Sequence, residues 1–310
     1  MLGAIVTLGY PLLVKLPFYQ HFGILVLMYA TLASAWNILG GYTGQISIGH
    51  GAFFGIGAYA STVLVSRFGI SPWIGMLAGA LVAVVVAVAI GYPTFRLRGH
   101  YFVMATIGAA EIIQVVFSNW RAVGGAVGMY IPMVGDSWSL LQFTSKAPYY
   151  YIMLTILSAT VATVLWLERS KLGYCLKAIR EDTEAAQSLG VSATGYKLLA
   201  MGLSALFTSL VGSFYAQYVL FIDPESVLGI SISVQMCLVA ILGGVGTVYG
   251  PLLGSLVMVA LSEGTRVFLG GGGKGVDLIV YGTLIIVVAL FQPQGLYRLA
   301  TRLVATEGRE

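Results

Sequence analysis

Charged residues are scarce in this sequence. Asp, Glu, Lys and Arg make up 9% of its 310 residues, whereas a soluble domain carries about 25%. The charges are missing in blocks, and uncharged runs such as 73–91 and 148–167 are long enough to cross a hydrocarbon core of about 30 Å as helices. This pattern excludes a soluble globular domain. We therefore expect an all-α polytopic membrane protein with a single transmembrane domain over 1–310.

Three further signatures are missing. The two cysteines, Cys175 and Cys237, do not form the pattern of a disulfide framework. The first residues, MLGAIVTLGYPLLVKL, lack the basic region and cleavage site of a signal peptide, so we expect a short or interfacial first segment. GGGGKG at 270–275 lacks the Ser or Thr that follows the lysine of a phosphate-binding loop, and we expect an external turn there. The sequence thus predicts no ATPase and no cofactor in this chain.

Hydropathy predicts about ten membrane spans. They are 2–14, 22–39, 43–66, 73–91, 101–119, 148–167, 198–219, 226–242, 247–263 and 276–292. The third contains Gln45, Ser47, His50 and several glycines, so we expect it to be broken or re-entrant. Two short echoes, ILGGYTG at 38–44 and ILGGVGT at 241–247, hint at an internal repeat.

Lysine and arginine predict the orientation of the chain in the membrane. With alternating spans, ten of them fall on one side and six on the other, and the loop 168–197 carries five of the ten. Cytoplasmic loops are enriched in these residues. We therefore place 168–197 and both termini in the cytoplasm and the loop 120–147 outside.

The stretch REDTEAAQSLG at 180–190 gathers charges that are rare elsewhere. Three acidic residues stand where the first turn of a short helix would favour negative charge: Glu181, Asp182 and Glu184. Three apolar residues follow at helical spacing: Ala185, Ala186 and Leu189. Gly190 suits the left-handed residue that closes a helix, and Ser192 or Thr194 suits the cap of the next. Two interpretations remain: a helix that docks in a groove of a soluble partner, or a solvated connector between spans.

The core of this loop resembles a known motif. Glu184-Ala185-Ala186, three residues and then Gly190 are similar to the EAA-x-x-x-G core of ABC-importer permeases, although KLLAM at 197–201 replaces the Leu-Pro that follows in that family. The resemblance implies a coupling helix that docks on an ATP-hydrolysing subunit. The coupling residues that it implies are Arg180, Glu181, Asp182, Glu184, Ala185, Ala186, Leu189 and Gly190.

Longer stretches resemble the M-type permease subunit of the branched-chain amino acid ABC importers. They are 38–61, 101–120, 173–198, 214–227, 241–254 and 291–296, in that order along the chain. The resemblance implies half of the pore of an importer for leucine, isoleucine, valine or related neutral amino acids, with a type II-like fold. It also implies a subunit that catalyses no reaction and lies in a bacterial or archaeal cytoplasmic (inner) membrane. The implied partners are a second homologous permease, two P-loop ATPases that bind ATP, an external amino-acid-binding protein and membrane lipid, with no nucleic acid.

Polar residues within the spans are candidates for the substrate pathway. Glu111 lies near the middle of its span, where a carboxylate is costly, and it serves either a hydrogen bond between helices or transport itself. Asn37, Gln45 and Ser47 offer neutral polar groups at the junction of two spans. His50 is either a packing residue or a ligand, and no Cys or carboxylate lies near it at the spacing of a metal site.

Two other classes of transporter are alternatives to the importer. A self-sufficient secondary transporter needs ionisable coupling groups inside the membrane, and Glu111 is the one acid deep in a predicted hydrophobic run. A passive channel for a small neutral solute such as urea would fit an uncharged pore. Neither alternative accounts for the charged helix at 180–190.

Overall fold

The structure is a computed structural model that describes residues 9–11, 14, 16–133, 135–268, 282–283 and 295–297. The predicted spans 2–14 and 276–292 lie largely outside the described residues, and the glycine stretch 270–275 lies wholly outside them.

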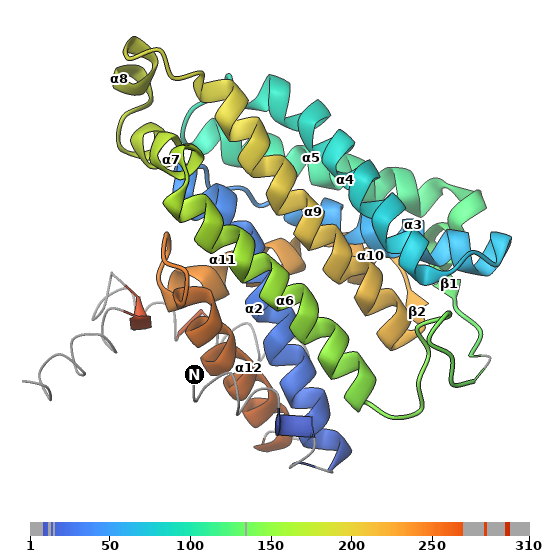
Figure 1. The fold of residues 1–310 in the computed structure, drawn as a ribbon. Coiled ribbons are helices and arrows are strands. Elements are labelled where there is room, and N and C mark those ends of the chain that lie inside the picture. The colour runs from blue at the N-terminus through green and yellow to red at the C-terminus, as the bar shows by residue number, and fades with distance from the viewer. Residues whose placement is uncertain are drawn as a thin grey trace, which may run out of the picture.

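Long helices form most of the described chain and run roughly along one bundle axis (Figure 1). The long helices are α2 (Pro17–Thr43), α3 (His50–Phe68), α4 (Pro72–Thr94), α5 (His100–Asn119), α6 (Ala147–Arg169), α9 (Ala193–Val219), α11 (Ile230–Gly243) and α12 (Gly250–Phe268). Six helical segments are long and apolar enough to cross a membrane: α2, α4, α5, α6, α9 and the run Pro224–Gly243. The remaining two, α3 and α12, have 19 residues each, which corresponds to a length of about 28 Å.

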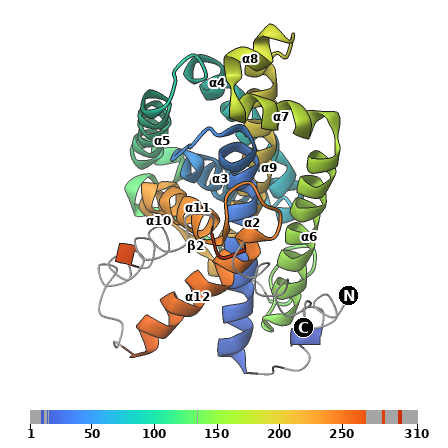
Figure 2. The ribbon, with the colours of Figure 1, turned by 90° about the vertical axis from the view of Figure 1, so that its left-hand side faces the viewer.

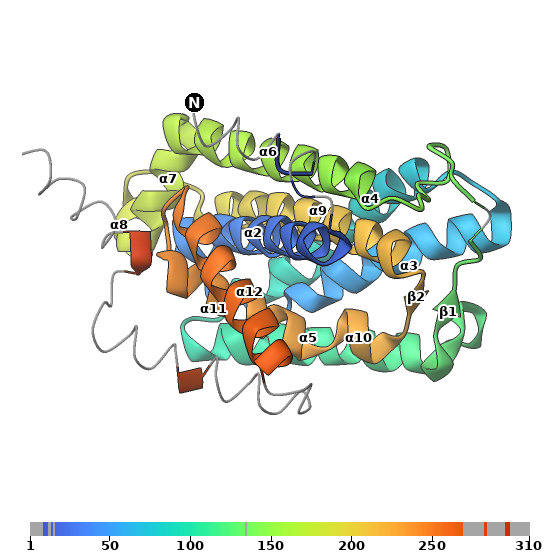
Figure 3. The ribbon, with the colours of Figure 1, turned by 90° about the horizontal axis from the view of Figure 1, so that it is seen from below.

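Helices α2 and α9 lie at the centre of the bundle. Helix α6 flanks them on one side and α5 on the other (Figures 2 and 3). Glycines allow α9 to approach α3 closely, because a Cβ on Gly57 would overlap the Ser209 carbonyl and one on Gly212 would overlap the Phe54 carbonyl. At the same crossing, the Ser213 hydroxyl donates a hydrogen bond of 2.8 Å to the Gly57 carbonyl.

The two ends of the bundle differ. At one end, which we call the α7–α8 end, lie the short helices α7 (Lys171–Glu181) and α8 (Thr183–Ser188). At the other, the β1–β2 end, strands β1 (Met129–Tyr130) and β2 (Phe221–Ile222) pair antiparallel. Two 3-10 turns, η1 (Arg121–Val123) and η2 (Gly125–Val127), precede β1.

The segment between β1 and α6 is ordered by a carboxylate. Asp136 accepts hydrogen bonds from both the backbone N–H and the hydroxyl of Thr144. These bonds favour the ionised form and hold the pKa of the Asp136 carboxyl below its usual range.

The third predicted span, 43–66, is interrupted only near its start, and from His50 to Phe68 α3 is an unbroken helix. Helix α2 ends at Thr43, Gly44 adopts a left-handed conformation with φ of 71°, and α3 begins only at His50. The predicted span 226–242 corresponds to the candidate span Pro224–Gly243, which consists of two helices, α10 (Pro224–Leu228) and α11. Gly229 stands between them in extended conformation and interrupts the helical hydrogen bonds.

Candidate functional site

The loop 168–197 forms two helices rather than one. Helix α7 ends at Glu181, and the next residue, Asp182, is extended with φ of −153°. Its carboxylate caps α8 by accepting from the N–H groups of Glu184 at 2.8 Å and Ala185 at 3.0 Å. The prediction that Glu181 belongs to the first turn of the short helix is therefore wrong. Glu181 is the last residue of α7, Asp182 is the N-cap, and α8 begins at Thr183.

The apolar residues of α8 face in different directions. Ala186 is 3% exposed and packs against Ile179 and Ala193. Ala185 is exposed, and Leu189 is 86% exposed. The predicted single apolar face is thus divided, because one small side chain fills a gap in the fold while Leu189 faces away from it. Gly190 has φ of 85°, which confirms the predicted left-handed residue at the helix end.

Glu184 connects α8 to the turn between α4 and α5. Its carboxylate lies 2.6 Å from Nη1 of Arg98, and both side chains are largely exposed, at 70% and 79%. An exposed ion pair of this kind contributes about 0–1 kcal/mol, so its main effect is to orient α8. A polar groove of about 570 Å³ separates the two segments and is lined by the turn 95–99 and by residues of α7 and α8.

Arg180 reaches from the end of α7 to the bundle. Its Nη1 donates a hydrogen bond of 2.7 Å to the Gly41 carbonyl in the last turn of α2, where helix carbonyls lack an intrahelical partner. A Cβ at Gly246 would overlap this guanidinium group, and one at Gly44 would lie 3.3 Å from the Arg180 Cγ. The side chain therefore fits between glycines of two segments that are far apart in the sequence.

Asn37 binds these two segments together. Its amide donates to the Thr247 carbonyl at 2.9 Å, and its Oδ1 accepts from the Gly246 N–H at 2.8 Å. The glycine motifs at 38–44 and 241–247 consequently lie against each other, and Arg180 contacts both. We call this arrangement the glycine junction.

The other neutral pathway candidates make contacts that differ from those of Asn37. Ser47 is buried, and its carbonyl accepts a bond of 2.7 Å from the Trp36 indole N–H. His50 is buried and lies 2.8 Å from the Ser204 hydroxyl, which in turn donates to a carbonyl of α2. Gln45 lines the polar groove beside α8. These four residues therefore lie at separate helix contacts and at the α7–α8 end.

Glu111 lies on the outward face of α5. Its neighbours on that face include Met104 and Val115, which are 71% and 56% exposed. A Cβ at Gly108, one turn away, would meet no atom of the described residues within 4 Å. Within the part of the chain that the structure describes, Glu111 has no hydrogen-bond or ion-pair partner. The carboxylate predicted within a span therefore lies on a helix face that no other described helix covers.

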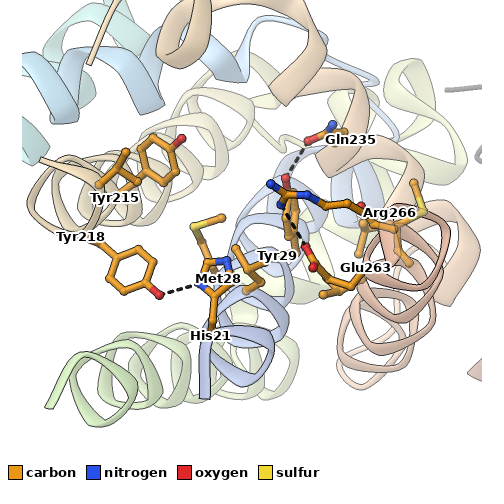
Figure 4. A pocket seen from close by; sticks show the side chains of 14 residues that line it. His21, Met28, Tyr29, Tyr215, Tyr218, Gln235, Glu263 and Arg266 are labelled. Carbon is orange, nitrogen blue, oxygen red and sulfur yellow. Dashed lines mark hydrogen bonds and ion pairs between the residues drawn. The ribbon is translucent and has the colours of Figure 1, made fainter. Parts of the chain in front are cut away.

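A cavity near the β1–β2 end contains polar residues that the sequence analysis did not single out (Figure 4). It measures about 290 Å³ and lies between α2, α9, α11 and α12. One acid in its lining, Glu263, falls at the last residue of the predicted span 247–263, where it looks like an end residue. Helix α12 continues to Phe268, which places Glu263 within the helix; a predicted span one turn longer would have found it.

No metal site is found in the described ranges, where no three His, Cys, Asp or Glu side chains gather as ligands. Both cysteines are free thiols.

Comparison with known proteins places most of this fold in one family. The family described as "Branched-chain amino acid transport system / permease component" matches residues 21–289. The permease protein LivM of the high-affinity branched-chain amino acid transport system of Salmonella typhimurium is 28% identical over 295 residues, which cover 88% of this chain and 68% of LivM. LivH of the same organism is 24% identical over 284 residues, covering 86% of this chain and 90% of LivH. BraD of Pseudomonas aeruginosa is 26% identical over 285 residues, covering 86% of this chain and 91% of BraD.

Proposed function

The chain belongs to the family of permease components of branched-chain amino acid transport systems, and from this membership we propose that it forms half of the translocation pore of an ATP-driven importer. Its cargo is leucine, isoleucine, valine or a related neutral amino acid. The chain lowers no chemical barrier; it converts motion of its partners into access to the pore. The resemblance seen in the sequence motifs is thereby confirmed at the level of the family.

The observation that carries this proposal is the shape of the α7–α8 end. A short helix with a complete Asp182 cap projects from the bundle and presents Leu189, which is 86% exposed. A large apolar side chain in water at a helix end suits insertion into a groove on a soluble partner. We assign Glu184, Ala185 and Leu189 to the contact with an ATPase subunit, and Asp182 and Gly190 to the shape of the helix.

Arg180 has a different part in this scheme. It contacts Gly41 rather than the projecting helix face, so we assign it to transmission between α7 and the glycine junction. Movement of an ATPase subunit against α8 passes through α7 to the ends of α2 and α11, which belong to the bundle itself.

The outward face of α5 is assigned to the second permease. A carboxylate facing lipid at the middle of a span is costly. Glu111 is an exposed residue of α5, and α5 lies at an edge of the bundle (Figure 2). A homologous subunit that covers this face would exclude lipid and enclose a polar pathway. Similarity to both LivM and LivH, two permease proteins of one kind of system, supports a homologous pair.

The remaining parts of the assembly follow from the same scheme. We assign about ten spans and a type II-like architecture to the full chain, with 2–14 and 276–292 added to the described helices. The protein is a multi-pass membrane protein; its α7–α8 end and both termini face the cytoplasm of a bacterial or archaeal cell. Two P-loop ATPases bind ATP there, and an amino-acid-binding protein delivers the cargo at the β1–β2 end.

The first experiment is purification of the tagged chain from its native membrane in mild detergent, followed by reconstitution into liposomes. We expect to recover a second permease and two ATPases, and to measure leucine uptake that requires ATP and the binding protein. A chain that purifies alone and carries solute without ATP would contradict the proposal and favour a secondary transporter or a passive channel.

A further inference from the structure

The cavity near the β1–β2 end is lined by helix segments close to that end. His21 lies in the first turns of α2, Tyr218 is the penultimate residue of α9, and Ser262, Glu263 and Arg266 lie in the last turns of α12. In the orientation proposed above, the cavity is therefore in the outer half of the membrane. A solute released by an external binding protein would reach this half first.

Two opposite charges project into the cavity from α12. The Glu263 side chain is 12% exposed, whereas that of Arg266 is 68% exposed, and their nearest charged atoms are 3.8 Å apart. This separation exceeds the length of a direct hydrogen bond, about 3.2 Å at most. Glu263 is the last residue of the predicted span 247–263, and a largely buried carboxylate at such a position is a candidate functional group. The long contact leaves hydrogen-bonding capacity on both groups.

Four other polar side chains of the cavity are bonded in two pairs. Nδ1 of His21 and the Tyr218 hydroxyl are 2.6 Å apart, and the Tyr29 hydroxyl donates to Gln235 at 2.8 Å. In Figure 4 the first of these pairs lies opposite the charged pair of α12. The apolar side chains of the lining are Leu25, Met28, Val219, Val239, Met258 and Val259.

This combination matches the chemistry of a free aliphatic amino acid. The ammonium group needs an anion, the carboxylate a cation, and the side chain an apolar wall. At about 290 Å³, the cavity lies at the small end of ligand pockets, which begin at about 300 Å³. Its one carboxylate and its one guanidinium group stand a single helical turn apart, a spacing suited to the two charged groups on one α-carbon.

We propose that this cavity is a transit site for the zwitterionic amino acid, with Glu263 binding its ammonium group and Arg266 its carboxylate. The inference rests on the proposed function and adds the position and chemistry of a site to it. Without substrate, Glu263 and Arg266 neutralise each other through the long ion pair. When the amino acid binds, its ammonium and carboxylate groups replace this contact.

Direct protection from labelling tests the site without transport. Ser262 lines the cavity, so Ser262→Cys, in a chain with Cys175→Ser, is reacted with a small maleimide in the purified assembly. Leucine is expected to slow the reaction at least about threefold, whereas isoamylamine and isocaproate, which each lack one charge, leave it unchanged. The control Val127→Cys, at a position 83% exposed near β1, should react equally fast with and without leucine.

Uptake by the full assembly provides the second readout. Glu263→Gln preserves side-chain length, and Arg266→Gln removes the charge but leaves a shorter polar side chain. Each should raise the KM for leucine about tenfold or more, the size of a lost charge-assisted hydrogen bond. Wild-type affinity in both variants, or protection by isocaproate equal to that by leucine, would overturn the inference while wild-type uptake still supports the proposed function. Absence of ATP-dependent uptake in the wild type would instead overturn the proposed function.

Discussion

Adding one methyl group at the glycine junction should displace Arg180. Gly246 has φ of 79°, a conformation that costs an L-residue about 1–2 kcal/mol. A Cβ there would also overlap Nη1 of Arg180, which must then leave the Gly41 carbonyl. A hydrogen bond from a charged donor contributes about 1.5–3 kcal/mol, but Arg180 is an exposed residue, so solvent screening reduces this to about 1 kcal/mol. Gly246→Ala should therefore lower the free energy of unfolding by about 2–3 kcal/mol.

A double-mutant cycle separates the two contributions. Gly69→Ala gives the backbone cost alone, because Gly69 has φ of 63° and no described atom within 4 Å of its Cβ position. If Gly246→Ala acts by displacing the guanidinium, its effect should be about 1 kcal/mol smaller in an Arg180→Ala background. Denaturant titration in detergent gives the free energies, and leucine imported per ATP hydrolysed reports coupling. Additivity within about 0.5 kcal/mol, with unchanged coupling in Arg180→Ala, would refute the role given to Arg180.

Three other predictions concern separate surfaces. Leu189→Asp should leave the free energy of unfolding within about 0.5 kcal/mol of the wild type, because the side chain is 86% exposed. It should nevertheless reduce the amount of ATPase that purifies with the tagged chain. Full recovery of the ATPases would contradict the assignment of Leu189 to the docking contact. Gly108→Cys, beside Glu111 on the open face of α5, labelled at its thiol with benzophenone maleimide, should cross-link to the second permease on illumination. Cross-linking to no partner in the intact assembly would contradict the assignment of that face. Gly57→Ala should destabilise the bundle by about 1–3 kcal/mol, since it forces α3 away from α9. The control Gly264→Ala, where a Cβ meets no described atom within 4 Å, should be neutral or stabilising by up to about 1 kcal/mol. Thermal unfolding in detergent compares the two variants.

The positions of the long helices were largely predictable from the sequence. The span expected at 101–119 is α5, His100–Asn119, and the one expected at 73–91 is α4, Pro72–Thr94. The second of these segments is uncharged and the first carries a single charge, Glu111, over the thickness of a membrane, so the extent of both follows from local composition. The gap before His50 was also predictable, because glycines and polar residues cluster there. The helix that leads into the span expected at 198–219 is α9, which begins at Ala193, and its N-cap is Ser192, one of the two capping residues that the sequence predicts.

The contacts between distant segments were not predictable in the same way. Arg180 was expected on the docking surface with its charged neighbours, but its partner Gly41 lies 139 residues earlier. Ala186 was expected to face a partner, and it is buried because Ile179 and Ala193 enclose it. Each of these placements depends on how helices pack in three dimensions, and no periodicity in a single sequence carries that information.

Contacts made through bare backbone transmit displacement differently from contacts between side chains. In a layer of leucines, a shift of one helix is partly absorbed when side chains change rotamer, so the neighbouring helix moves less. At Gly41 and Gly246 there is no rotamer to change, and Asn37 fixes the two chain segments with two short hydrogen bonds. A displacement of the Arg180 guanidinium would therefore move the segments 38–44 and 241–247 together, because Gly41 and Gly246 have no side chain that could change rotamer to absorb it.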